Sequence, residues 1–283
     1  MAKNNQGLIQ RTSRGVALVT GASSGIGRAI ATRLAQDDFE VYGTSRKLEA
    51  NAAGAPPFQL LELDVTSDDS VRACLERVLA KAGRIDVLVN NAGYLLSGAV
   101  EEVSLSAAQA QFETNFFGAA RMIQAVLPTL RAQASGTIVN ITSLAAIVPL
   151  PFWGFYNASK AALESLTETL REELRPFGIR VAAIEPGSIK TAFYAVDHKA
   201  TPLAAYTGRR TRFEKTIQQF EQKAPGPELV ARKVSQLVRS KSPPLHNAVT
   251  FEAQLFPRLR TWFPQALFEL GLRSSFHLDD PAF

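Results

Sequence analysis

Residues 16–27 read VALVTGASSGIG, and this stretch decides the fold class. It begins with a short apolar run of β-prone residues, passes through a turn rich in glycine and serine, and enters a helical pattern that extends from Gly25 to Asp37. A buried strand that enters a helix through a glycine-rich turn is typical of the first unit of a parallel α/β sheet. The stretch therefore predicts that further units of strand and helix follow.

The same alternation continues to about residue 187. Strands are predicted at 16–21, 40–45, 58–65, 85–93, 136–143 and 179–187, and helices at 25–37, 67–82, 104–134, 156–177 and 227–241. Most strand runs are continuously apolar, which indicates a sheet covered on both faces. We predict a single-domain, doubly wound parallel α/β sheet of about seven strands with helices on both faces, its seventh strand at the edge and formed by 246–251.

The remaining segments differ in composition. A polar tail at 1–14 precedes a catalytic domain at 15–251, within which the polar and irregular residues 188–224 are expected to form a lid over a ligand. Residues 252–283 form an apolar extension, expected to be helical and to be broken by Pro257 and Pro264. Three roles remain open for the extension: covering the substrate cleft, forming a subunit contact, or lying on a membrane surface.

Composition excludes several classes of protein. The chain of 283 residues is 46% hydrophobic and 20% charged, as in globular proteins, and its net charge of +5 is spread along the chain without a nucleic-acid-binding motif. Cys74 is the only cysteine, so an intramolecular disulfide and a cysteine zinc site are excluded, and the scattered His198, His246 and His277 suggest no metal site. Without a signal-like or membrane-spanning apolar run, a cytoplasmic location is expected.

The glycine-rich turn has the properties of a phosphate cradle. Glycine allows a tight turn and close approach of the backbone to a ligand, and the N-terminus of the following helix offers free N–H groups to phosphate. The spacing G-x-x-x-G-x-G differs from the general dinucleotide fingerprint and from the P-loop. The residues expected to contact a dinucleotide here are Gly21, Ser23, Ser24, Gly25, Ile26 and Gly27.

The second strand indicates which dinucleotide. It ends at Ser45 and Arg46, where a carboxylate would bind the ribose of NAD, and an arginine can instead pair with a 2′-phosphate. We therefore predict NADP(H); the alternative is that Arg46 is a surface charge and the protein is indifferent between the two cofactors. Asp64 and Val65 end the third strand and are expected near the adenine, unless Asp64 only caps the helix that begins near Ser67.

Tyr156 and Lys160 form a candidate acid/base pair. They are four residues apart at the start of a predicted helix, so both side chains leave the same helical face. An ammonium group beside a phenol favours the phenolate, so Lys160 is expected to lower the pKa of Tyr156. Alone, this spacing is a weak signal.

Together these motifs resemble the short-chain dehydrogenases/reductases over about residues 16–191. The matching stretches, in the family's order and spacing, are TGASSGIG (20–27), DV (64–65), NNAG (90–93), Asn115, Ser143, YNASK (156–160) and PGSIKT (186–191). The chain runs on past the seventh predicted strand, and Ser24 stands where the family's 3-oxoacyl reductases often have a basic residue. The resemblance is therefore closer to the steroid/retinoid branch.

The resemblance implies a role for each motif residue. Tyr156 is the general acid, Lys160 holds the nicotinamide ribose, Ser143 donates to the substrate oxygen, and Asn115 holds a water that supplies protons to Lys160. Asn90 is expected to tie neighbouring strands. The further cofactor contacts implied are Asn91, Ala92, Gly93, Pro186, Gly187, Ile189 and Thr191.

The substrate is indicated only by an apolar wall between Ser143 and Tyr156. Its Leu144, Phe152 and Trp153, with Phe193 in the lid, favour a bulky hydrophobic ketone, aldehyde or alcohol such as a steroid, retinoid or long-chain compound. The alternatives are a 3-oxoacyl-thioester reductase of lipid synthesis, and a nucleotide-sensing or scaffold protein without turnover. A homo-oligomer is expected, with a dimer favoured and membrane-surface association least favoured.

Overall fold

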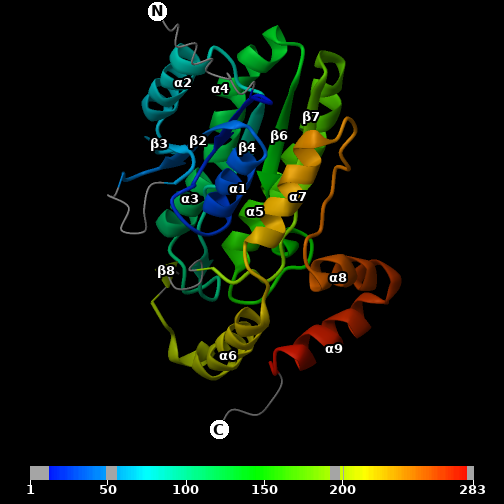
Figure 1. Cartoon of the computed structure of the whole chain (residues 1–283). Coiled ribbons are helices and arrows are strands. Elements are labelled where there is room, and N and C mark those ends of the chain that lie inside the picture. Colours follow the sequence, from blue (N-terminus) through cyan, green and yellow to red (C-terminus); the bar gives the residue numbers. More distant parts are fainter. Residues whose placement is uncertain (1–12, 49–55, 192–197, 200, 279–283) are drawn as a thin grey trace, which may run out of the picture.

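A parallel six-stranded sheet in the order β3-β2-β1-β4-β6-β7 organises the chain in the computed structural model (Figure 1). The structure describes residues 13–48, 56–191, 198–199 and 201–278. Strand order reverses beside β1, which lies between β2 and β4, so the carboxyl ends of β1 and β4 border the crevice where such sheets bind ligands. The strands are β1 (Val16–Val19), β2 (Glu40–Ser45), β3 (Gln59–Glu62), β4 (Val87–Asn90), β6 (Gly136–Ile141) and β7 (Ile179–Ile184).

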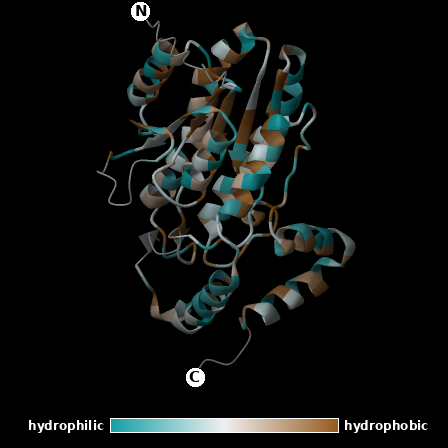
Figure 2. Cartoon of the chain, viewed as in Figure 1, coloured by the Kyte–Doolittle hydropathy of each residue, from teal (hydrophilic) through white to brown (hydrophobic). Residues whose placement is uncertain are grey.

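Helices cover both faces of the sheet, as predicted. Val16 and Leu18 of β1 pack with α2 (Asp68–Ala82), α4 (Gly118–Ala132) and α5 (Gly154–Leu174). The alternate residues Ala17 and Val19 pack with α1 (Gly25–Gln36) and α7 (Glu228–Arg239) on the other face. Successive side chains of a strand point to opposite faces, which explains the continuously apolar strands seen in brown in Figure 2.

The long helix predicted at 104–134 is divided by a π turn. Helix α3 (Leu105–Phe112) is capped by the hydroxyl of Ser104, and a π-helical turn at Glu113–Phe117 joins it to α4. Asn115 lies within this turn and is 1% exposed. Such turns are frequent at functional sites.

The predicted seventh strand is wrong. In 246–251 only Ala248 forms an isolated bridge, to Glu185, although backbone bonds from Ala183 N to Leu245 O and from Glu185 N to Asn247 O hold the segment beside β7. Pro243 and Pro244 precede it and Thr250 already caps the next helix, so too few residues remain for a regular strand. The short strands β5 (Leu96–Ser97) and β8 (His198–Lys199) pair with each other outside the main sheet.

The prediction that 188–224 is irregular is also wrong in part. Its second half forms helix α6 (Thr207–Lys223), preceded by a 3₁₀ turn at Ala204–Tyr206.

In the extension, α8 (Phe251–Trp262) continues through Pro257, whereas Pro264 separates it from α9 (Gln265–Ser275) as predicted. Further 3₁₀ turns lie at Leu144–Ala146 and Arg175–Phe177.

Among the helices that the structure describes, none combines the length and the apolar character needed to cross a membrane.

Candidate active site

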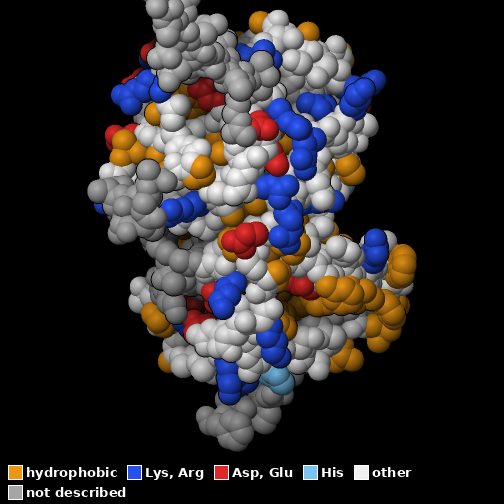
Figure 3. Space-filling view, viewed as in Figure 1, with side chains coloured by type: hydrophobic (Ala, Val, Ile, Leu, Met, Phe, Trp, Pro, Cys, Tyr) orange, Lys and Arg blue, Asp and Glu red, His pale blue; other side chains and the backbone are white. Residues whose placement is uncertain are grey.

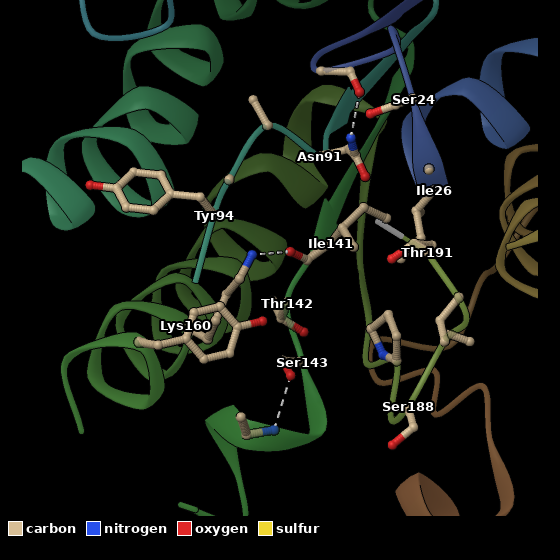
Figure 4. Close-up of a pocket in the computed structure, with 18 of the residues that line it drawn as sticks. Ser24, Ile26, Asn91, Tyr94, Ile141, Thr142, Ser143, Lys160, Ser188 and Thr191 are labelled. Carbon is tan, nitrogen blue, oxygen red and sulfur yellow. Dashed lines mark hydrogen bonds between the residues drawn. The ribbon is translucent and has the colours of Figure 1, made fainter. Parts of the chain in front are cut away.

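A cavity of about 1140 Å³ lies at the carboxyl ends of the central strands. Its wall contains every predicted cofactor residue except Gly27, together with Ser143, Tyr156 and Lys160 of the predicted catalytic set. Asn115 is buried behind the wall. Figure 4 shows residues that line this cavity from the glycine turn and the start of α1, the segments after β4 and β7, the end of β6, and α5.

The glycine turn forms one end of the cavity. Gly21 and Gly25 have φ angles of +66° and +53°, a region that L side chains rarely adopt. Gly27 supports the turn from behind, because a Cβ there would lie 2.2 Å from Gly21 O and 2.4 Å from Asn91 Nδ2. The side chain of Ser24, the N-cap residue of α1, does not cap the helix, which leaves the N–H groups of the first turn to a ligand.

A network from β4 fixes the turn in place. Thr20 Oγ1 accepts from Asn91 N at 2.9 Å and from Ala92 N at 3.0 Å, and Asn91 Nδ2 donates to the carbonyls of Thr20 and Gly21. The neighbouring Asn90 donates to Asn140 Oδ1 at 2.9 Å. The prediction that Asn90 ties neighbouring strands is thus confirmed, since Asn140 belongs to β6.

Tyr156 and Ser143 form a hydrogen-bonded pair at the cavity wall. Ser143 lies two residues after β6, at the start of a 3₁₀ turn, and its hydroxyl also accepts from Ala145 N at 3.1 Å, which fixes the side chain. Burial raises the pKa of Tyr156 to about 12, and the hydrogen bond with Ser143 opposes this rise. Tyr156 is therefore a neutral phenol at pH 7, the form that can donate a proton.

The prediction that Lys160 lowers the pKa of Tyr156 is wrong. Lys160 Nζ donates to Ile141 O at 2.8 Å and lies 6.0 Å from the centre of the Tyr156 ring (Figure 4). The ammonium is thus held by a carbonyl, and desolvation of the enclosed phenol determines its pKa. Burial also lowers the pKa of Lys160 to about 8, against the charge of Glu164, which raises it.

The side chain of Asn115 is already engaged by the protein. Its Oδ1 accepts from Tyr94 N at 3.0 Å, and its Nδ2 donates to Tyr94 O at 3.0 Å and to Ser159 Oγ at 3.1 Å. Both amide hydrogens are used, so the amide locks the chain after β4 against α5. Its predicted role in holding a water for Lys160 stays a prediction.

The far end of the cavity carries positive charge. Arg46 follows β2 and lines the cavity with Ser45, Lys47 and Asp64. Burial opposes ionisation of Asp64, but hydrogen bonds from Thr66 and the charges of Arg46 and Arg121 outweigh it and lower its pKa.

The capping alternative for Asp64 is wrong. The N-cap of α2 is Ser67, whose hydroxyl accepts from Ser70 N at 3.2 Å. Asp64 Oδ1 accepts from Thr66 N at 2.9 Å instead and remains in the cavity wall.

The segment after β7 is anchored by a residue that the sequence did not single out. Pro186, Gly187, Ile189 and Thr191 line the cavity as predicted. Glu252 of α8 accepts from Ser188 N at 2.9 Å, and a Cβ at Gly187 would lie 2.3 Å from Thr250 Oγ1. The extension therefore holds this segment in place.

The apolar wall differs from the prediction. Leu144 and Trp153 line the cavity, but Phe152 lies outside it, with its ring 5.5 Å from that of Phe213 and 6.5 Å from that of Tyr206. Phe152 has a left-handed φ of +62°, and its neighbours Leu150 and Trp153 line the cavity instead. The predicted Phe193 lies outside the described residues.

Apolar residues of α6 and the extension complete this wall: Ile217, Phe220, Phe256 and Phe276. For α6 a signal was present, because Phe213, Ile217 and Phe220 follow the i, i+4, i+7 spacing of a helix face. No comparable pattern identified Phe256 or Phe276.

The extension also has an outer face. Phe251, Trp262 and Leu267 are 75%, 76% and 56% exposed, and Figure 3 shows hydrophobic side chains gathered over α8 and α9. Of its three predicted roles, covering the cleft agrees with the lining residues of α8. The subunit contact and the membrane surface stay predictions.

The sequence model described as short chain dehydrogenase matches residues 15–201. The chain belongs to the short-chain dehydrogenase family. It is 35% identical over 266 residues to a 3-ketodihydrosphingosine reductase of Bacteroides thetaiotaomicron, covering 91% of this chain and 96% of the relative.

Other relatives agree with the branch suggested by the sequence. The chain is 36% identical over 250 residues to retinol dehydrogenase 8 of Bos taurus, covering 81% of this chain and 80% of the relative. A crystal structure of a short-chain dehydrogenase from Streptomyces avermitilis superposes with a TM-score of 0.79 at 34% identity, covering 95% of this chain and 99% of that one. This short-chain dehydrogenase is thus an oxidoreductase.

The cavity of this short-chain dehydrogenase fits a nicotinamide dinucleotide. Open N–H groups at the start of α1 face the glycine turn, and positive Arg46 lies beyond them. At the other end lie the hydroxyls of Tyr156 and Ser143, and Lys160 Nζ is 6.0 Å from the centre of the Tyr156 ring. A phosphate-binding turn and an acid/base pair in one cavity match the two ends of such a cofactor.

Gly27→Ala tests whether the glycine turn needs the close packing at Gly27. The added Cβ would overlap a backbone oxygen, so we expect a loss of about 1–3 kcal/mol in the free energy of unfolding and weaker dinucleotide binding. Thermal unfolding and calorimetric titration measure both. Gly271→Ala is the control, because nothing lies within 4 Å of a Cβ there, and equal behaviour of the two variants would contradict the role of Gly27.

Proposed function

We propose that this protein is an NADP(H)-dependent oxidoreductase that interconverts a ketone or aldehyde and an alcohol on a bulky hydrophobic substrate. The observation that carries the proposal is the neutral, hydrogen-bonded Tyr156 beside buried Lys160, between a phosphate-binding turn and an apolar wall. Arg46 at the cofactor end supports the choice of NADP(H), because a guanidinium pairs well with a 2′-phosphate.

Each polar residue has a distinct task in the proposed reaction. The bound dinucleotide would supply or accept the hydride. Ser143 would donate a hydrogen bond to the carbonyl oxygen of the substrate, and Tyr156 Oη would give that oxygen its proton as negative charge develops there. Lys160, held by Ile141 O, would bind the ribose of the nicotinamide, the role that the family resemblance implies.

The wall of the cavity supports a bulky apolar substrate. Trp153, Ile217, Phe256 and Phe276 line it from three separate parts of the chain. Apolar walls with few polar groups favour ligands that bury hydrocarbon. Relatives named for 3-ketodihydrosphingosine and for retinol also support a lipid-like compound.

A panel of carbonyl compounds tests this function, with NADPH absorbance as the readout. We expect kcat/KM to rise with the apolar area of the substrate, and Phe256→Asn to lower it for the bulkiest compounds by about 5- to 30-fold, or about 1–2 kcal/mol. Phe251→Asn is the matched control on the same helix, since Phe251 is exposed and outside the cavity wall. Acyl thioesters in the panel test the 3-oxoacyl reductase alternative, and turnover of nothing but these would reject the proposed substrate class.

A further inference from the structure

Two buried carboxylates share one imidazole behind the active site. Glu164 Oε1 and Glu185 Oε1 each lie 2.9 Å from His246 Nδ1. The two glutamates are 7% and 3% exposed, whereas the imidazole is half-exposed. We call Glu164, Glu185 and His246 the carboxylate–imidazole cluster.

A neutral imidazole does not satisfy this cluster. Both carboxyl groups contact the same nitrogen, and a neutral ring brings no positive charge, so two ionised carboxylates would face each other here without a counter-charge. Glu164 Oε2 has no hydrogen-bond partner among the described residues. Among those residues, too, His246 alone forms ion pairs with Glu164 and Glu185.

The other charged groups around the cluster do not replace His246. On α5, Lys160 lies one turn before Glu164 and donates to Ile141 O. Glu168 Oε1 is 3.6 Å from His246 Nε2 and adds a further negative charge. Arg171 donates to the carbonyls of Val181 and Pro243.

The cluster joins the two halves of the active site. Glu164 follows Lys160 by one turn of α5, and Glu185 immediately precedes Pro186 of the cofactor-side segment. The backbone of the His246 segment is bound to β7 through Leu245 O and Asn247 O. An ionic link within the cluster therefore connects the catalytic helix to the segment that faces the cofactor.

We propose that His246, as an imidazolium, is a positioning residue of the active site: it links Glu164 to Glu185 and thereby holds α5 against the chain leading to Pro186. This proposal rests on the proposed function only in its assumption that the positioned groups bind a dinucleotide. Protonation of His246 and cofactor binding are then coupled, and each strengthens the other.

The direction of the pH dependence follows from the cluster. Burial raises the pKa of Glu185 to about 7, with Glu164 adding to the rise and His246 opposing it. Burial lowers the pKa of His246, but the two carboxylates outweigh it and raise the net value. The folded chain thus holds protons at pH values where the unfolded chain has released them, so the free energy of unfolding falls as pH rises. For each group the fall begins at its ordinary pKa, 4.5 for Glu185 and 6.5 for His246, and ends at its raised pKa in the folded chain.

Replacing His246 separates charge from shape. H246R keeps a permanent cation, so its Tm and its dissociation constant for NADPH should match those of the wild type near pH 6 and lose their decline through neutral pH. H246Q should lower Tm and weaken NADPH binding by about 5-fold or more already near pH 6. The change that follows titration of Lys160, near pH 8, should remain in both variants.

A second comparison does not depend on fitting the larger arginine. In the double variant E164Q/H246Q one carboxylate is neutral, so Tm should recover relative to H246Q alone. H277Q, at an exposed histidine, is the control and should follow the wild type at every pH.

Three results would overturn the proposal. They are a wild-type pH profile in H246R, unchanged Tm and NADPH binding in H246Q, or a wild-type Tm that EDTA lowers and Zn²⁺ restores, since the cluster would then hold a metal. The Tm measurements need neither substrate nor cofactor, so they test the cluster even if the proposed function fails.

Discussion

Tyr156→Phe is expected to lower kcat for carbonyl reduction by about 10²- to 10⁴-fold, the usual contribution of a positioned general acid. The phenol is hydrogen-bonded to Ser143 and its pKa is raised by burial to about 12, so at neutral pH it carries the proton that the reduced carbonyl oxygen needs. Phenylalanine retains the ring, which packs edge-on with Trp153 at 6.0 Å. NADPH binding should therefore change little while turnover is lost.

Steady-state kinetics and NADPH titration separate these two effects. Tyr206→Phe is the matched control, because its hydroxyl bonds to Glu101 and its side chain lies outside the cavity wall. If Tyr156→Phe kept its kcat, another group would supply the proton. If it lost NADPH binding as well, Tyr156 would act mainly through the shape of the site.

Arg46→Asp is expected to reverse the preference between NADPH and NADH. The guanidinium lies at the cofactor end of the cavity, and its charge helps to lower the pKa of Asp64 beyond the effect of the Thr66 hydrogen bonds. Loss of a charge-assisted hydrogen bond to a 2′-phosphate costs about 1.5–3 kcal/mol, so kcat/KM for NADPH should fall about 10- to 100-fold. An aspartate at this position can accept from the ribose hydroxyls of NADH.

The ratio of kcat/KM for the two cofactors is the measurement. Lys47→Gln removes the neighbouring cation in the cavity wall and should change the ratio less than Arg46→Gln does. A wild-type ratio near one would contradict the choice of NADP(H). If Lys47→Gln changed the ratio more than Arg46→Gln, Lys47 rather than Arg46 would be the residue that contacts the 2′-phosphate.

The central fold could be predicted because its signals are local. Strand β1, the glycine turn and α1 lie within residues 16–36, and alternation of apolar strands with amphipathic helices continues to β7. Each unit carries its own periodicity, and the right-handed connection of parallel strands then leaves few topologies. The six strands and their helices on both faces are confirmed.

The errors in the fold concern segments that depend on distant partners. Residues 246–251 lie beside β7, but the prolines before them and the α8 cap after them leave an isolated bridge. Helix α6 was missed because its polar residues outnumber Phe213, Ile217 and Phe220, whose apolar face is stabilised by contacts such as that between Phe213 and Phe276. Tertiary packing supplies much of the stability of such helices.

Residue types and their spacing were sufficient to predict most residues of the cavity wall, but they did not predict the pKa values of the groups in it. Tyr156 and Lys160 do share a face of α5 and lie 6.0 Å apart, measured from Nζ to the ring centre. The pKa of the phenol is raised because the hydroxyl is enclosed, and enclosure comes from residues far along the chain such as Phe213 and Phe276. The spacing of Tyr156 and Lys160 shows that they share a helical face but not how far the hydroxyl is removed from water.

By itself, the sequence determined the order of elements along the chain and their motifs. These are an apolar strand, a turn rich in glycine, and hydroxyl, phenol and ammonium groups placed after a strand and on one helical turn. Only the tertiary structure decided that Glu252 holds Ser188 N, that Phe256 and Phe276 close the cavity, and that His246 lies between Glu164 and Glu185. The reason is physical: backbone periodicity acts between near neighbours in the chain, whereas burial, charge pairing and cavity shape depend on contacts between residues that are distant in sequence.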